Sequence, residues 1–159
     1  MKKTITILSL LISGAIFFSS CTQSAQADLS VQATKEIMDA DIAMSNLATK
    51  EGFFKALLTY AADSVIIPRE GKLPFMNKPE VQASWGDKPV IKEITWSPVR
   101  AEAAKSGDMG YSFGFSTYKG SDTTTYTNYC TIWKKQKDGS WKFVFDGGNN
   151  TPAPGLSAK

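Results

Sequence analysis

Alternation of apolar residues with small or polar ones is the strongest pattern in the sequence, and it runs from Asp108 to Asn150. Residues of this kind favour β-strands, and an Asp-Gly pair between two such runs is a strong hairpin signal. The stretch therefore predicts an antiparallel meander of three strands joined by two tight turns. The runs are 108–118, 123–135 and 141–146, and the turn signals are 119–122 and 137–140.

The first run separates its side chains cleanly by size. Alternate residues of a strand share a face, so Tyr111, Phe113 and Phe115 lie on one face, with glycine and serine on the other. We expect the aromatic face to be covered. Gly110 and Gly114 mark where the backbone of a long sheet bends.

The last run places Trp141, Phe143 and Phe145 on one face and Asp146 on the other. The large aromatic side chains are predicted to form most of the core, and Tyr111→Ala or Phe113→Ala is expected to cost about 3–5 kcal/mol. This predicted core set is Trp96, Tyr111, Phe113, Trp133, Trp141 and Phe143.

Upstream of the meander, the spacing of apolar residues predicts helices. Apolar positions recur every three or four residues over 31–50 and again over 53–62. Asn77 followed by Glu80 is a capping box that begins a third helix, which ends at Trp85. The remaining segments read as a strand at 64–68, a loop at 69–74 and a strand at 90–104 that is bent or bulged at Pro98.

This order of elements predicts an α+β domain, in which helices lie on the concave face of a strongly bent antiparallel sheet. The chain of 159 residues fits one such domain, at 31–150. The flanking segments are a signal peptide at 1–20, a polar tether at 21–30 and a Pro/Gly/Ser-rich tail at 151–159.

The N-terminus carries an export signal. A basic start is followed by an apolar run that suits a signal peptide and is shorter than the ~20 residues of a membrane span. The following Phe18-Ser19-Ser20-Cys21 resembles the bacterial lipobox, whose cysteine is lipidated. This favours attachment to the membrane through Cys21, at the periplasmic face of the cell envelope. A competing Ala-x-Ala site would instead release a soluble protein by cleavage after Ala27.

Charge and composition exclude several kinds of chemistry. Removing Lys2 and Lys3 leaves 16 basic and 15 acidic residues, a net charge of +1, which argues against nucleic-acid binding. The sequence contains no histidine, so it offers neither a Ser-His-Asp triad nor a histidine metal site. We expect no cofactor and no metal, and we interpret Cys130 as a small strand residue and not as a reactive thiol.

Short motifs along residues 31–150 resemble one protein family. They include 40–44, 52–53, 60–65, 96–99, 106–111, 132–135 and 138–142. With these motifs the sequence is similar to the family called domain of unknown function 4440 (SnoaL-like), within the nuclear-transport-factor-2-like, cystatin-like cone fold. Asn77 and Thr127 stand where that family usually has glycine. The resemblance implies the cone fold, whose wider relatives include ketosteroid isomerases, scytalone dehydratases, polyketide cyclases and non-catalytic binding domains.

Asp41 is the leading candidate for a polar group in a pocket between the first helix and the sheet. It lies beside Ala40 on the apolar stripe, where desolvation would raise its pKa and suit it to act as a base. Tyr60 and Tyr111 are the candidate hydroxyl donors beside it. A structural role for Asp41, in a cap or a pair within the fold, is the alternative. The predicted ligand-binding set is Asp41, Met44, Tyr60, Trp96, Tyr111, Asn128 and Asp146.

Three function classes follow from these features. The first is a tethered module that binds a small apolar ligand or serves an accessory role. The second is an isomerase, dehydratase or cyclase that uses Asp and Tyr as acid and base without a metal. The third is a homodimeric interaction domain whose sheet face is covered by a partner.

Lipidation of Cys21 is testable by fractionation and intact mass. Wild-type protein is expected in the membrane fraction with a diacylated N-terminal cysteine, and Cys21→Ala is expected to lose both the lipid mass and the membrane attachment. A soluble wild-type protein that begins at Asp28 would contradict this prediction.

Overall fold

The computed structural model describes residues 27–155. The predicted signal peptide, Cys21 and most of the predicted tether lie outside the described residues, as do the last four residues of the tail. No helix within the described range is long and apolar enough to cross a membrane.

The described chain folds into three helices and six strands. The predicted helices are present to within two residues, whereas the segment expected to be a loop at 69–74 contains a short strand, because Phe75 pairs with Ile67. The elements are α1 (Ser30–Glu51), α2 (Phe53–Tyr60), β1 (Ala61–Arg69), β2 (Lys72–Phe75), α3 (Lys78–Trp85), β3 (Ile94–Ala103), β4 (Met109–Lys119), β5 (Thr124–Lys135) and β6 (Trp141–Asn150).

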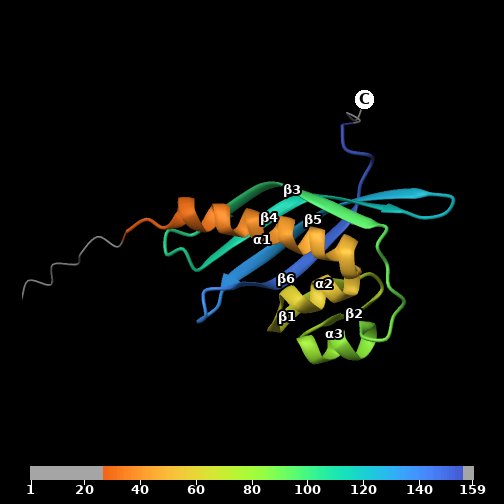
Figure 1. Cartoon of the computed structure of the whole chain (residues 1–159), viewed down its shortest axis with the longest axis horizontal. Coiled ribbons are helices and arrows are strands. Elements are labelled where there is room, and N and C mark those ends of the chain that lie inside the picture. Colours follow the sequence, from red (N-terminus) through yellow and green to blue (C-terminus); the bar gives the residue numbers. More distant parts are fainter. Residues whose placement is uncertain (1–26, 156–159) are drawn as a thin grey trace, which may run out of the picture.

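The strands form one curved sheet in the order β2-β1-β6-β5-β4-β3. The predicted α+β architecture, with helices on the concave side, is confirmed: α1 lies across the sheet, and α2 and α3 lie beside β1 and β2 (Figure 1). The sheet is mixed and not purely antiparallel, because β1 and β6 are parallel neighbours. β1 enters the sheet directly from α2, so no hairpin turn forces it to run against its neighbour.

The predicted capping box begins α3. The backbone N–H of Glu80 donates to the Asn77 side chain at 3.0 Å, and the Glu80 carboxylate accepts from the N–H of Met76 at 2.9 Å. Helix α1 ends immediately before Gly52. The φ of Gly52, +104°, is a backbone conformation that favours glycine.

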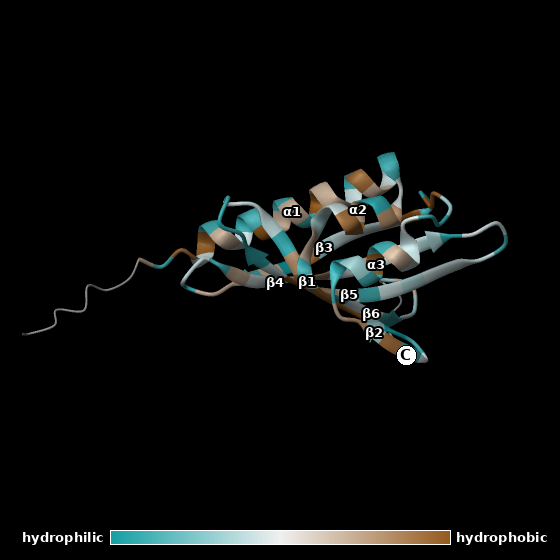
Figure 2. Cartoon of the chain, turned by 90° about the horizontal axis from the view of Figure 1, so that it is seen from below, coloured by the Kyte–Doolittle hydropathy of each residue, from teal (hydrophilic) through white to brown (hydrophobic). Residues whose placement is uncertain are grey.

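Helix α1 is amphipathic, and one stripe of it is buried against the sheet. The stripe holds Ala33, Ile37, Met44 and Ala48, all at most 2% exposed, and Asp41 lies in the middle of it. Hydrophilic and hydrophobic residues accordingly alternate along the helix (Figure 2). Thr34 and Ser45 on α1 bond the backbone of β3, through the N–H of Ala103 and the carbonyl of Trp96.

The covered face of β4 is its small-residue face, so the expectation that Tyr111 and Phe113 lie in the core is wrong. Ser112 is fully buried, whereas Phe113 is half-buried on the opposite face. A Cβ atom on Gly110 would lie 2.6 Å from Cδ1 of Ile37 on α1. The helix thus approaches the sheet so closely that only small residues fit beneath it.

A β-bulge in β6 reverses the faces expected for its C-terminal half. Trp133 pairs with Phe143, whereas the preceding residue, Ile132, pairs with Phe145. Val144 is the extra residue between the two pairs. A bulge of this kind re-aims the side chains that follow it, so Asp146 lies opposite Thr131 on the concave face. A second register shift, between Pro98 and Arg100 of β3, matches the bulge predicted at Pro98.

The two faces of the sheet are expected to differ in their contribution to stability. Phe143 is fully buried on the concave side, so Phe143→Ala should lower the free energy of unfolding by about 3–5 kcal/mol. Phe113→Ala, on the half-buried face, should cost about 1–2 kcal/mol. Urea denaturation of both variants measures the difference. Equal losses would mean that the faces of β4 are assigned incorrectly.

Candidate functional site

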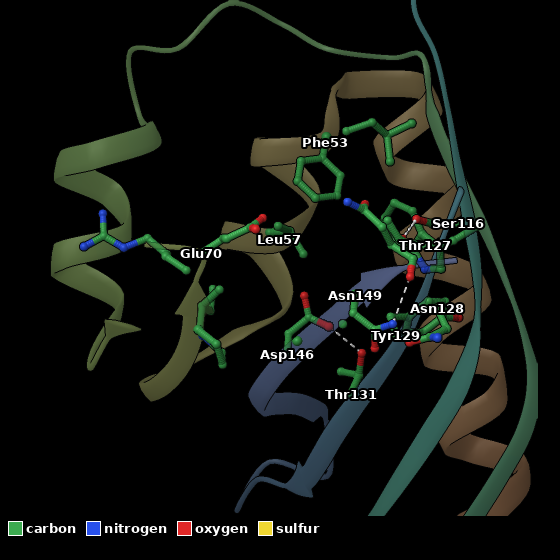
Figure 3. A pocket seen from close by; sticks show the side chains of 18 of the residues that line it. Phe53, Leu57, Glu70, Ser116, Thr127, Asn128, Tyr129, Thr131, Asp146 and Asn149 are labelled. Atoms are coloured by element: carbon green, nitrogen blue, oxygen red, sulfur yellow. Dashed lines mark hydrogen bonds between the residues drawn. The ribbon is translucent and has the colours of Figure 1, made fainter. Parts of the chain in front are cut away.

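A cavity of about 650 Å³ lies between the C-terminal half of α1, the start of α2 and the concave face of the sheet. Phe53 and Leu57 cover it from α2, and β5 and β6 form its floor (Figure 3). The rest of its apolar wall comes from Met44, Ile67, Trp85, Ile94 and Trp96. The polar side chains on the floor are Thr127, Tyr129, Thr131 and Asp146.

Asp146 presents its carboxylate to this cavity. One oxygen accepts a hydrogen bond from the Thr131 hydroxyl at 2.6 Å, and within residues 27–155 no lysine or arginine forms an ion pair with the group. Burial raises the pKa of Asp146 to about 6; the Thr131 hydrogen bond opposes the rise, and the charge of Asp41 adds to it. Asp146 therefore changes its charge close to neutral pH.

Asp41 lies on α1, beside the cavity, and is fully buried. Its two oxygens accept hydrogen bonds from Nε1 of Trp96 at 2.7 Å and from the Tyr129 hydroxyl at 3.1 Å. Burial raises the pKa of Asp41, and hydrogen bonds from Ser112, Trp96 and Tyr129 partly offset that rise. Ser112 in turn accepts from Nε1 of Trp133 at 2.8 Å. One carboxylate thus joins α1 to side chains of three strands.

Tyr129 connects Asp41 to the cavity. Its ring is part of the cavity wall while its hydroxyl reaches Asp41. Gly114 and Gly148 are its partners on the two neighbouring strands, and a Cβ atom on Gly114 would lie 2.7 Å from the tyrosine hydroxyl. Gly114 therefore makes room for the tyrosine side chain, and Gly148 allows the close approach of the β5 backbone. Burial and the Asp41 carboxylate both raise the pKa of Tyr129, so its hydroxyl keeps its proton and acts as a donor.

Arg69 and Glu70 line the cavity where β1 ends. The guanidinium of Arg69 is engaged elsewhere: its Nε donates to the carbonyl oxygen of Leu73 at 2.7 Å, and its Cζ lies 3.9 Å from the centre of the Phe75 ring. The Glu70 side chain reaches toward the cavity beside Leu57 (Figure 3).

The structure brings together some of the residues predicted from the sequence. Met44, Trp96, Asn128 and Asp146 line the cavity, and Asp41 lies beside it on α1, where it accepts a hydrogen bond from Trp96. Their roles in ligand binding stay predictions.

Tyr60 and Tyr111 do not line the cavity. Tyr60 packs edge-on against Trp133, with ring centroids 6.2 Å apart. Tyr111 lies on the outer face of β4 opposite Glu102, because the small-residue face of that strand is the covered one. The hydroxyl that meets Asp41 belongs to Tyr129 instead.

Tyr129 and Thr131 are the site residues that the sequence did not single out. Both lie on the concave face of β5, together with Thr127 and Trp133. The alternation of side chains along β5 is therefore the sequence feature that could have identified them. The polar groups of the site are carboxylates and hydroxyls, which can form hydrogen bonds and carry negative charge. Nowhere in the described part of the chain do three Cys, Asp or Glu side chains gather as a metal site.

No protein-family model matches the sequence, and no curated protein is significantly similar to it. Solved structures do resemble it. A ketosteroid isomerase-like protein from Erwinia carotovora atroseptica aligns with a TM-score of 0.60 and 14% identity, over 76% of this chain and 98% of that one. An NTF2-like protein of unknown function from Pseudomonas putida aligns with a TM-score of 0.61 and 15% identity, over 82% and 94%.

An NTF2-like protein with a cystatin-like fold from Novosphingobium aromaticivorans aligns with a TM-score of 0.60 and 13% identity, over 79% of this chain and 86% of that one. At these identities the similarity establishes the fold. The chain is an NTF2-like, cystatin-like cone, an α+β fold whose concave face holds the cavity described above.

The raised pKa of Asp146 predicts how its substitution changes stability with pH. The folded value of about 6 exceeds the ordinary 3.8, so the folded state holds the proton more tightly, and this group makes the fold less stable as pH rises from 4 to 6. Above pH 6 the penalty is about 2–3 kcal/mol. Asp146→Asn is therefore expected to gain about 1–2 kcal/mol at pH 7.5, after loss of part of the Thr131 hydrogen bond.

That gain should be small at pH 4 and disappear near pH 3, where Asp146 is protonated in both the folded and the unfolded state. Chemical denaturation of wild type and variant at pH 4, 6 and 7.5 measures it. If the variant gains the same stability at all three pH values, or loses stability at pH 7.5, then the folded state does not disfavour the ionised form of Asp146.

Proposed function

We propose that this protein is an exported lipoprotein, tethered to the cell envelope through Cys21, whose cone domain binds a small and largely apolar ligand. The cavity on the concave face is the observation that carries this proposal. Ligand sites are commonly cavities of about 300–1,000 Å³ with apolar walls and a few polar groups. The cavity of about 650 Å³ has this character, with Asp146 and Thr131 on its floor.

The shape of the site supports binding from the open side of the cone. α2 covers the cavity through Phe53 and Leu57, while the ends of β1 and β6 border it. The tether would hold this cavity near the membrane from which an apolar molecule could be taken up. The Ala-x-Ala site at 25–27 supports the alternative of a soluble exported protein with the same cavity.

Blocking the cavity tests the proposal. Thr127 is half-buried on the cavity floor, and Thr125, two residues away on the same strand, is exposed and outside the cavity. Wild type and Thr125→Trp are expected to bind one equivalent of the neutral dye Nile red with equal affinity. Thr127→Trp, which fills the cavity, should bind it at least about tenfold more weakly, a loss of ~1.4 kcal/mol.

Melting temperatures of both variants control for folding. Equal dye binding by wild type and Thr127→Trp, or no binding by folded wild type, would contradict the proposal. Mass spectrometry of organic extracts from the purified protein would then identify any ligand that copurifies.

A second candidate is an enzyme of the isomerase or dehydratase kind, favoured by one observation. A general base works best when its pKa lies near the working pH, and the pKa of Asp146 is about 6 on the cavity floor. Exchange of an α-proton of a bound cyclic ketone into heavy water, present in wild type and absent in Asp146→Asn, would distinguish this candidate from a binding module.

A third candidate is a homodimer formed through the outer face of the sheet. Phe113 and Phe115 form an edge-on pair there, with ring centroids 5.8 Å apart, and Met109 is 43% exposed. Sedimentation equilibrium decides between monomer and dimer. This candidate is compatible with ligand binding, because the outer face is opposite the cavity.

A further inference from the structure

Acidic side chains lie in and beside the cavity, among its apolar walls. Asp146 and Glu70 line it, and the buried Asp41 lies close enough to add to the negative potential at Asp146. Arg69 is the basic residue among those that line the cavity, and its guanidinium is turned onto the Phe75 ring and the Leu73 carbonyl. The charges facing the cavity are therefore mainly negative, and no described cation neutralises Asp146.

Aromatic rings surround the same space. Phe53, Trp85, Trp96 and Tyr129 all belong to the cavity wall, and Phe53 meets Trp96 edge-on with ring centroids 5.9 Å apart. The face of an aromatic ring is the negative end of its quadrupole, and it attracts ammonium groups, most strongly when water is excluded. Negative carboxylates and aromatic rings in one cavity favour the same kind of ligand.

We propose that the ligand is a small organic cation, with an apolar body and one positively charged amine or quaternary ammonium group that faces Asp146. The inference rests on the proposed function and names the ligand class for the same cavity. The apolar body would contact Leu57, Met44 and Ile67, which line the cavity.

The cost of desolvating Asp146 decides between a cation and a neutral ligand. A neutral ligand that fills the cavity removes the remaining water from the carboxylate and leaves its charge without a partner, which is costly unless the carboxylate takes up a proton. A cation supplies the missing partner and is itself stabilised by the rings. Glu70 at the end of β1 adds to the attraction during approach.

The two alternatives predict opposite responses to pH. The titratable groups whose charge interacts with Asp146 are Asp41 from α1 and Tyr129 and Cys130 from β5. Arg69 and Glu70, from β1 and the turn after it, line the same cavity. Thr131 contributes a neutral hydroxyl. A cation binds the ionised carboxylate, so its affinity falls as pH drops through about 6. A neutral acceptor binds the protonated carboxyl group, so its affinity rises over the same range.

The test compares two probes of the same shape, the permanently charged benzyltrimethylammonium ion and its uncharged carbon isostere neopentylbenzene. Binding to the full mature chain is followed by tryptophan fluorescence, since Trp85 and Trp96 line the cavity. At pH 7.5 the cation is expected to bind at least tenfold more tightly than the isostere. Its Kd should rise about tenfold from pH 7.5 to pH 5, as Asp146 becomes protonated.

Substitutions assign the effect to one carboxylate. Asp146→Asn keeps the shape and an oxygen acceptor for Thr131, and it should weaken cation binding at least tenfold. The isostere should bind this variant as tightly as wild type or more tightly, because the charge without a partner is gone. Asp63→Asn, at an exposed carboxylate of β1 outside the cavity, should change neither Kd. If Asp146→Asn fails to fold, the pH series on wild type decides alone.

Equal or tighter binding of the isostere, tighter cation binding at pH 5, or full cation binding by folded Asp146→Asn would overturn the inference. Nile red separates this failure from that of the proposed function. If the dye binds wild type and is lost in Thr127→Trp while the cation does not bind, the cavity is a ligand site of another class. If neither the dye nor the cation is affected by Thr127→Trp, both proposals fail.

Discussion

The architecture depends on one buried carboxylate. Asp41 is completely removed from solvent on the apolar stripe of α1, and it accepts hydrogen bonds from Trp96 of β3 and Tyr129 of β5. Hydrogen bonds to a charged group contribute about 1.5–3 kcal/mol each, whereas burying the charge costs several kcal/mol. The raised pKa of Asp41 shows that desolvation outweighs the donors. The network therefore adds little net stability, but it fixes where α1 lies, because any shift would leave buried donors and a buried charge without partners.

The position of α1 determines the chemistry of the concave face. Close approach of the helix requires small residues beneath it, as the contact of Ile37 with the Gly110 position shows. The space further along the sheet is left open as the cavity. The bulge at Val144 turns Asp146 into that space, where the negative charge of Asp41 helps to raise its pKa. A structural carboxylate and a cavity-facing carboxylate thus interact through their charges, and Tyr129 lies next to both.

Local patterns were sufficient to predict the three helices, five of the six strands and the α+β class, because each depends on periodicity, capping or turn residues; the short strand β2 was expected to be a loop. The sequence was less informative about which face of each strand is covered and about the register between strands. The aromatic residues of β4 alternate as strongly as those of β6, yet Phe113 faces outward and Phe143 inward, because the choice depends on how closely α1 approaches. The bulge at Val144 has no local signature and reversed the face expected for Asp146. Asp41 was found through its place on the helix stripe, whereas its partner Tyr129 became apparent only when β5 was placed beneath α1.

Asp41 and Asp146 lie on the concave side with no ion-pair partner among residues 27–155, and both keep their protons more tightly than ordinary aspartates. A carbon-detected NMR titration of the side-chain carboxyl groups, in wild type and in Tyr129→Phe, measures this directly. In wild type Asp146 should titrate near pH 6 and Asp41 above its ordinary value of 3.8. Loss of the Tyr129 donor should raise the pKa of Asp41 further. Titration of both groups at or below pH 4 in wild type, or an Asp41 pKa that falls in Tyr129→Phe, would contradict the account.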